Sequence, residues 1–94
     1  MKIRIQQNCI RIRLSDEDMI LLNDINEVTE SLCLTKNNVY QYTLRLSDQN
    51  YIETGLNSMT VLANKEDFNQ PDDVSVKWHS EYGIKVLIES DLHE

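Results

Sequence analysis

Residues 2–14 alternate between aliphatic and polar side chains, with a short polar break at Gln7 and Asn8. A period of two on both sides of such a break predicts a β-hairpin with one buried face. Asn8 is a suitable turn residue because asparagine tolerates a positive φ. The aliphatic side chains expected on the buried face are Ile3, Ile5, Ile10, Ile12 and Leu14.

A change of period then predicts one short helix over residues 16–25. Ser15 can cap this helix, with Asp18 three residues later as its partner in a capping-box-like arrangement. Acidic side chains in the first turn also suit the positive end of the helix dipole. The apolar stripe that we expect to cover one face of a sheet consists of Met19, Leu22 and Ile25, with Leu21 beside them.

The rest of the chain returns to a period of two, and turn residues divide it into short strands. One break predicts a helical turn that Asn64 caps, Phe68 anchors to the core and Pro71 ends. The strands expected after the helix are residues 30–34, 38–46, 51–56, 59–63, 74–78 and 84–92, with Val74, Val76, Trp78, Ile84, Val86 and Ile88 facing inward.

These elements predict a mostly β (α+β) fold of about eight short strands. Because strands and helices do not alternate, we do not expect a parallel sheet. Hairpin-sized spacings favour a curled antiparallel sheet or a partial barrel, with the short helix after the first hairpin covering an open side. A chain of 94 residues suits a single domain, residues 1–94.

Charge is distributed unevenly along this acidic chain. The net charge is -7, yet residues 1–13 hold four cations and no carboxylate. Nucleic acid is repelled by a surface that is acidic overall, so we expect no nucleic-acid partner. No run approaches the ~20 apolar residues of a membrane span, and the first residues lack the apolar segment of a signal peptide. We therefore expect a cytoplasmic protein without a membrane contact.

The polar face of the predicted first hairpin carries four cations, Lys2, Arg4, Arg11 and Arg13. On paired strands, side chains two residues apart lie about 7 Å from each other and cross-strand neighbours about 5 Å. Arginine binds phosphate or carboxylate through two parallel hydrogen bonds, so these cations could form a site for a small anionic ligand or an acidic peptide. The alternative, which the sixteen acids of the chain favour, is an exposed face whose cations pair with neighbouring acids such as Glu89 and Asp91.

Other chemistry finds little support in the sequence. His79 and His93 are the only histidines, and no HxH, HExxH or Cys/His cluster is present, so we expect no metal site and no cofactor. Two isolated glycines cannot form a phosphate-binding loop, and no nucleophile motif occurs. Cys9 and Cys33 lack CxxC spacing and are expected to be free thiols in or near the core, with a disulfide as the alternative.

The aromatic side chains have two interpretations. Tyrosines can line a core with their hydroxyls at its rim, and they are also enriched at dimer interfaces. The core interpretation is the favoured one. The residues concerned are Tyr40, Tyr42, Tyr51 and Tyr82, together with Trp78.

The opening pattern K-I-R-I-x-x-N-x-I-R-x-R-L resembles the start of a small, uncharacterised bacterial protein family, in which a helix capped by Ser or Thr follows. The residues that match are Lys2, Ile3, Arg4, Ile5, Asn8, Ile10, Arg11, Arg13 and Leu14, with Ser15 as the cap. Residues 39–46 and 84–92 extend the resemblance more loosely. It implies a discrete bacterial domain, and it implies no activity.

Together these observations predict a non-enzymatic cytoplasmic binding or accessory module that acts through protein–protein contact or self-association as a homodimer. The second hypothesis is a small anion- or phosphate-ligand-binding domain that uses the basic side of the first hairpin, with phosphate-ester chemistry as its enzymatic form.

Overall fold

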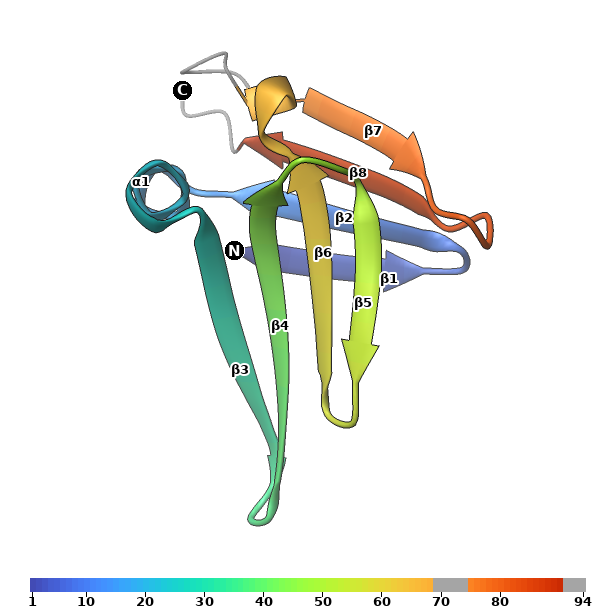
Figure 1. The fold of residues 1–94 in the computed structure, drawn as a ribbon. Coiled ribbons are helices and arrows are strands. Elements are labelled where there is room, and N and C mark those ends of the chain that lie inside the picture. Colours follow the sequence, from blue (N-terminus) through green and yellow to red (C-terminus); the bar gives the residue numbers. More distant parts are fainter. Residues whose placement is uncertain (69–74, 91–94) are drawn as a thin grey trace.

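The structure, a computed structural model, describes residues 1–68 and 75–90 of the chain (Figure 1). Most of them lie in strands, with one α-helix after the first hairpin and one 3-10 turn, as the sequence predicts. The elements are β1 (Lys2–Gln6), β2 (Cys9–Leu14), α1 (Asp16–Ile25), β3 (Glu27–Thr35), β4 (Asn38–Ser47), β5 (Tyr51–Gly55), β6 (Ser58–Asn64), η1 (Lys65–Phe68), β7 (Ser75–His79) and β8 (Lys85–Ser90).

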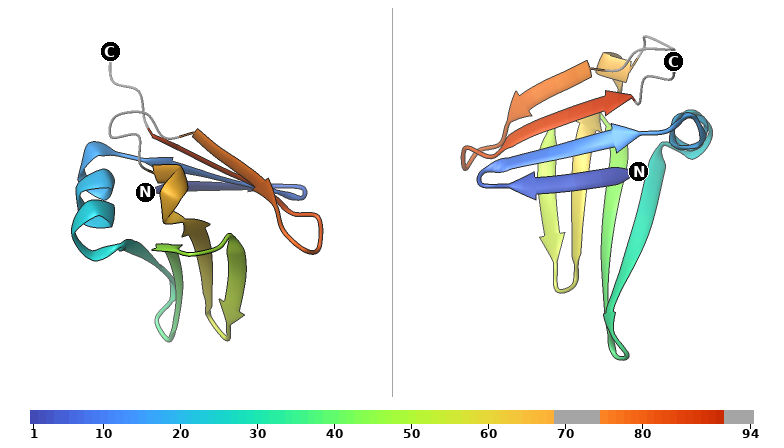
Figure 2. Two further views of the ribbon diagram at one scale, coloured as in Figure 1. Left: turned by 45° about the horizontal axis from the view of Figure 1, so that its top comes forward. Right: turned by 180° about the vertical axis from the view of Figure 1, so that it is seen from behind.

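The strands form two four-stranded sheets. Sheet I has the order β1-β2-β8-β7, and sheet II has the order β3-β4-β6-β5. Each sheet consists of two antiparallel hairpins whose second strands lie side by side in parallel. The strands of the two sheets run across one another, and sheet II extends well past β1 (Figure 1; Figure 2).

The parallel pairs correct the prediction of an antiparallel fold. Ile12 pairs with Ile88 across β2 and β8, and Leu44 pairs with Val61 across β4 and β6. The prediction excluded parallel pairing because it looked for a helix between each pair of parallel strands. Here β5 connects β4 to β6, and the chain from β2 to β8 passes through α1, the whole of sheet II and β7. The single curled sheet or partial barrel is not confirmed, because the strands divide into two sheets that do not close.

The hydrophobic core lies between the two sheets, and α1 covers one side of it (Figure 2). Burial of each large aliphatic side chain there contributes about 1.5–3 kcal/mol. The central strands supply most of the core. Its members are Ile10, Ile12, Leu14, Leu22, Val28, Leu44, Val61, Ala63, Val76, Val86 and Ile88.

Three aliphatic side chains expected to face the core are exposed instead, and one of them, Leu21 of α1, is 42% exposed. Ile5 is 64% exposed, because it lies on the edge strand β1 near the hairpin turn. Ile25 is 60% exposed, because α1 ends there and Asn26 turns the chain away in a left-handed conformation with φ of 63°. Val74 lies outside the described residues.

The capping predictions are largely confirmed. The Ser15 hydroxyl accepts a hydrogen bond from the Asp18 amide, and the Asp18 carboxylate accepts one from the Ser15 amide, which completes a capping box. The Asn64 side chain accepts a bond from the Glu66 amide at 3.0 Å. In the first hairpin the positive φ falls on Gln7, at 54°, rather than on Asn8. Pro71 lies outside the described residues.

Candidate functional site

The outer face of sheet I gathers most of the chain's cations. Residues that pair in register project to the same side of a sheet, and Ile10, Ile12 and Val86 occupy the inner side. The intervening residues face outward from all four strands. We call this surface the basic face, and it consists of Lys2, Arg4, Gln6, Cys9, Arg11, Arg13, Ser75, Lys77, His79, Lys85, Leu87 and Glu89.

Charge on the basic face is opposite to that of the rest of the molecule. The face contains six of the chain's nine Lys and Arg residues, and Glu89 is its one carboxylate within the described residues. Its formal charge is +5 on a chain whose total is -7, which leaves -12 for the remainder. Such a separation attracts an anionic partner to one side of the molecule.

The four cations predicted from the sequence come together here. Lys2 lies opposite Arg13, and Arg4 lies opposite Arg11, on neighbouring strands. The four side chains and Ile3 line a shallow hollow of about 280 Å³. Like charges directly opposite each other destabilise a sheet, so this arrangement carries an energetic cost that the fold does not require.

Pairing with acids neutralises this group only in part. The Arg11 Nε donates to Glu89 Oε1 at 2.7 Å, as expected for a charge on a neighbouring strand. Both side chains are about one third exposed, so the pair contributes at most about 1 kcal/mol. Arg13 also has an interaction partner, whereas the exposed Lys2 and Arg4 form no ion pair with any described residue. Asp91 lies outside the described residues.

Sequence analysis missed three members of the basic face, Lys77, His79 and Lys85. Alternation along the predicted strands does place Lys77 and Lys85 opposite to the inward-facing side chains, so their outward direction could have been read. What the sequence did not reveal is that β8 lies beside β2, which places Lys85 opposite Cys9 and Lys77 on the far side of Leu87 from Arg11.

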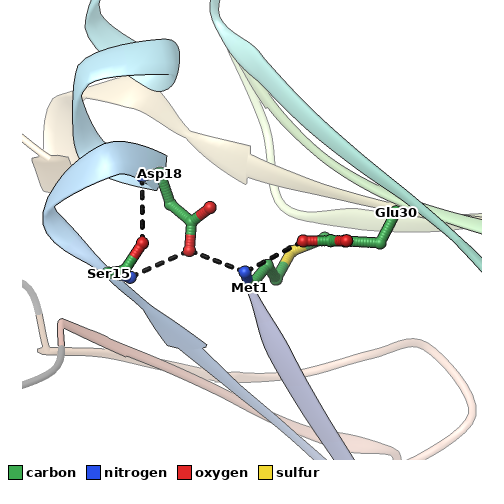
Figure 3. A network of polar contacts seen from close by, with 4 residues as sticks. All are labelled: Met1, Ser15, Asp18 and Glu30. Atoms are coloured by element: carbon green, nitrogen blue, oxygen red, sulfur yellow. Dashed lines mark hydrogen bonds and ion pairs between the residues drawn. The ribbon is translucent and has the colours of Figure 1, made fainter.

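A partly buried polar network holds the start of β1 beside the basic face (Figure 3). The amino group of Met1 lies 2.8 Å from Asp18 Oδ2 and 3.1 Å from Glu30 Oε1. Burial disfavours the charged amino group, but its hydrogen bonds to Asp18 and Glu30 outweigh this and raise its pKa. Burial acts against the Asp18 carboxylate as well, and hydrogen bonds from the amino group and Ser15 nevertheless lower its pKa. The network joins β1, α1 and β3, and so fixes where Lys2 begins the basic face.

The structure divides the aromatic residues between two hollows. Tyr40 and Tyr42 are half-buried and line a hollow of about 330 Å³ beside β1. Tyr51, Trp78 and Tyr82 line another, of about 320 Å³, between β5 and the β7–β8 turn. The core prediction is wrong for Tyr51 and Tyr82, which are 48% and 89% exposed, because one lies on an edge strand and the other in a turn.

The two cysteines are free thiols, and neither belongs to the core. Cys9 is half-buried on the basic face, and Cys33 is exposed near the end of β3. No group of three or more His, Cys, Asp or Glu side chains that could hold a metal ion occurs among the described residues. His79 is exposed, and His93 lies outside the described part of the chain.

These features define a small two-sheet β domain with a cationic outer face. Residues 1–93 match the family described as "Family of unknown function (DUF7009)", and the chain belongs to this family. The expected membership of an uncharacterised family is thus confirmed. No curated protein and no solved structure matches the chain. Within the described residues, no helix is both long enough and apolar enough to cross a membrane.

Proposed function

We propose that this chain is a non-enzymatic, cytoplasmic binding module of bacteria whose basic face binds an acidic, extended segment of a partner protein. One observation carries the proposal. Six of nine cations gather on one face of an acidic chain, and two pairs of them lie directly opposite each other. A bound anionic segment would relieve the repulsion within those pairs.

The spacing of the cations favours an extended segment. Each strand of the first hairpin carries two cations that are two residues apart, Lys2 and Arg4 on β1 and Arg11 and Arg13 on β2. The two cationic side chains of each strand therefore lie about 7 Å from each other. An extended peptide with Asp or Glu at every second position repeats its carboxylates at the same distance. The contact between Arg11 and Glu89 illustrates how a carboxylate sits against an arginine on this face.

A second copy of the chain is one possible source of acidic groups, because -12 of formal charge lies outside the basic face. Self-association through this face would weaken as salt is added, because dissolved ions screen the attraction between exposed charges, with a screening length of about 10 Å at 0.1 M ionic strength. Sedimentation of the chain alone, at low and at high salt, detects a dimer of this kind, whereas a complex with another protein forms only when that protein is added.

A small phosphate ligand is the second candidate function. The observation that favours it is the hollow of about 280 Å³ that Lys2, Arg4, Arg11 and Arg13 line together. Guanidinium groups bind phosphate oxygens as readily as carboxylates, so this hollow could hold a phosphorylated metabolite. The same variants test both candidates when they are titrated with different ligands.

The test uses a fluorophore-labelled peptide of alternating Glu and Thr, with its Gln counterpart as the uncharged control. The variant combines Arg4→Gln with Arg11→Gln. Its matched control combines Lys36→Gln with Lys65→Gln, which changes the net charge equally at exposed sites outside the basic face.

We expect the wild type and the control variant to bind the Glu peptide and the basic-face variant to lose binding. If both variants bound the Glu peptide equally weakly, the affinity would depend on net charge alone and not on the basic face. Absence of binding by the wild type would refute the proposal. Binding of pyrophosphate but not of the Glu peptide, lost in the same variant, would favour the phosphate candidate.

A further inference from the structure

The β7–β8 turn approaches the edge strand β5 at the end of sheet I opposite to Met1 (Figure 2). The hollow that Tyr51, Trp78 and Tyr82 line lies between these two segments. Its volume of about 320 Å³ is at the lower end of the range for small-molecule pockets. The residues that line it are Asn50, Tyr51, Ile52, Thr54, Trp78, His79, Ser80, Glu81, Tyr82 and Ile84.

The pocket joins an aromatic lining to the basic face. His79 lines the pocket and also belongs to the basic face, where it pairs in register with Lys85. Tyr51, Trp78 and Tyr82 supply aromatic surface within the pocket. We propose that this pocket binds a small planar aromatic molecule whose anionic group is held by Lys85 and His79 at its rim.

The aromatic lining of this pocket favours a planar ring as its ligand. Aromatic side chains bind planar rings by stacking, largely irrespective of the identity of the ring.

Charge decides the class of ligand. Glu81 also lines the pocket and would repel an anion, whereas Lys85 would attract one. An anionic ligand therefore requires Lys85→Gln to weaken binding and Glu81→Gln to strengthen it. A cationic ligand requires the reverse, and an uncharged one requires neither change.

The single tryptophan of the chain makes this test direct, because Trp78 lines this pocket and its fluorescence responds to a change there. Adenosine monophosphate and phenyl phosphate are the probes, adenosine and phenol are their uncharged counterparts, and inorganic phosphate is the ring-free control. We expect at least one probe to change the fluorescence saturably and more tightly than its uncharged counterpart, with no saturable change from phosphate alone.

The variants fix the site. Tyr82→Ala removes an exposed side chain, so the fold persists, and we expect binding about five-fold or more weaker through lost stacking. Lys85→Gln should weaken binding about two- to five-fold. The variant that combines Arg4→Gln and Arg11→Gln should leave the fluorescence response unchanged, because neither residue lines this pocket.

The proposal is overturned if neither probe gives a saturable response, or if Lys85→Gln strengthens binding while Glu81→Gln weakens it. It is also overturned if the uncharged counterparts bind as tightly as the anions. Its failure leaves the acidic-peptide proposal untouched, since that proposal rests on Arg4 and Arg11.

Discussion

Arg4 and Arg11 face each other across the β1–β2 hairpin, on the outer side of sheet I. Arg11 is paired with Glu89 on its other side, and Arg4 is exposed without an ion pair to any described residue. Two guanidinium groups in directly opposed positions repel each other, so the sheet would be more stable with another residue at position 4. This unfavourable pair is the basis of our proposal that the face binds an anionic partner.

Reversal of one charge should therefore stabilise the protein. In the Arg4→Glu variant the new carboxylate lies opposite Arg11, and we expect the free energy of unfolding to rise by about 0.5–1 kcal/mol. Urea denaturation measures the change. Lys36→Glu makes the same change in net charge within the β3–β4 turn and serves as the control. A gain of equal size in the control, or a loss in Arg4→Glu, would contradict the repulsion inferred here.

The amino-terminal network should make stability depend on pH in both directions. Asp18 has a lowered pKa, so its contribution is complete above its ordinary value of 3.8 and is lost as the pH falls through the lowered value. The Met1 amino group has a raised pKa, so its contribution is complete below its ordinary value of 8.0 and is lost as the pH rises through the raised value. The network therefore stabilises the fold most between these two ordinary values.

Replacement of Asp18 by Asn tests this window. Asp18 is buried, at 6% exposure. Its carboxylate binds the Met1 amino group and accepts a hydrogen bond from the Ser15 amide at the start of α1. We expect a loss of about 1–2 kcal/mol at neutral pH. The gap between wild type and variant should narrow below pH 3.8 and above pH 8.0. A gap that is constant across the whole pH range would show that only packing was changed.

Core packing predicts a contrast between two leucines of sheet II and its turns. Leu44 is fully buried at the centre of β4, and Leu56 is 97% exposed in the β5–β6 turn. Leu44→Ala should cost about 2–5 kcal/mol of unfolding free energy, because it leaves a cavity between the sheets. Leu56→Ala should change it by less than about 0.5 kcal/mol. Similar losses at both sites, measured by thermal or urea unfolding, would disagree with the placement of the core.

The two thiols should differ in reactivity. Cys33 is exposed and Cys9 is half-buried, so a thiol reagent should modify Cys33 first in the native protein. Both should react once the protein is unfolded without reductant, because both are free. Mass spectrometry after limited labelling identifies the modified residue. Faster modification of Cys9 would contradict the structure of the first hairpin.

Local patterns predicted individual elements well. The alternation before Leu14 gave the first hairpin and its buried side, and the Ser15–Asp18 spacing gave the start of α1. Such features depend on residues that are neighbours in the chain, and short-range physics determines them.

Pairing between distant strands could not be predicted in the same way. Nothing in the alternation of β2 or β8 specifies that they pair with each other. Any strand with one apolar face could take the same place and pack its apolar side chains into the core. The extension of the predicted four-cation group to Lys77 and Lys85 follows from that pairing alone. Exposure of Ile5 likewise follows from the edge position of β1, which its sequence does not encode.

Chemical-shift mapping by NMR would locate an acidic partner on the surface directly. Isotope-labelled protein is titrated with the alternating Glu–Thr peptide at low salt, and the amide signals of every strand are followed. We predict that the largest shifts fall on the outer face of sheet I, centred on Arg4 and Arg11, and that they vanish when those two residues are replaced by Gln. Shifts confined to sheet II, or none at all, would contradict binding through the basic face.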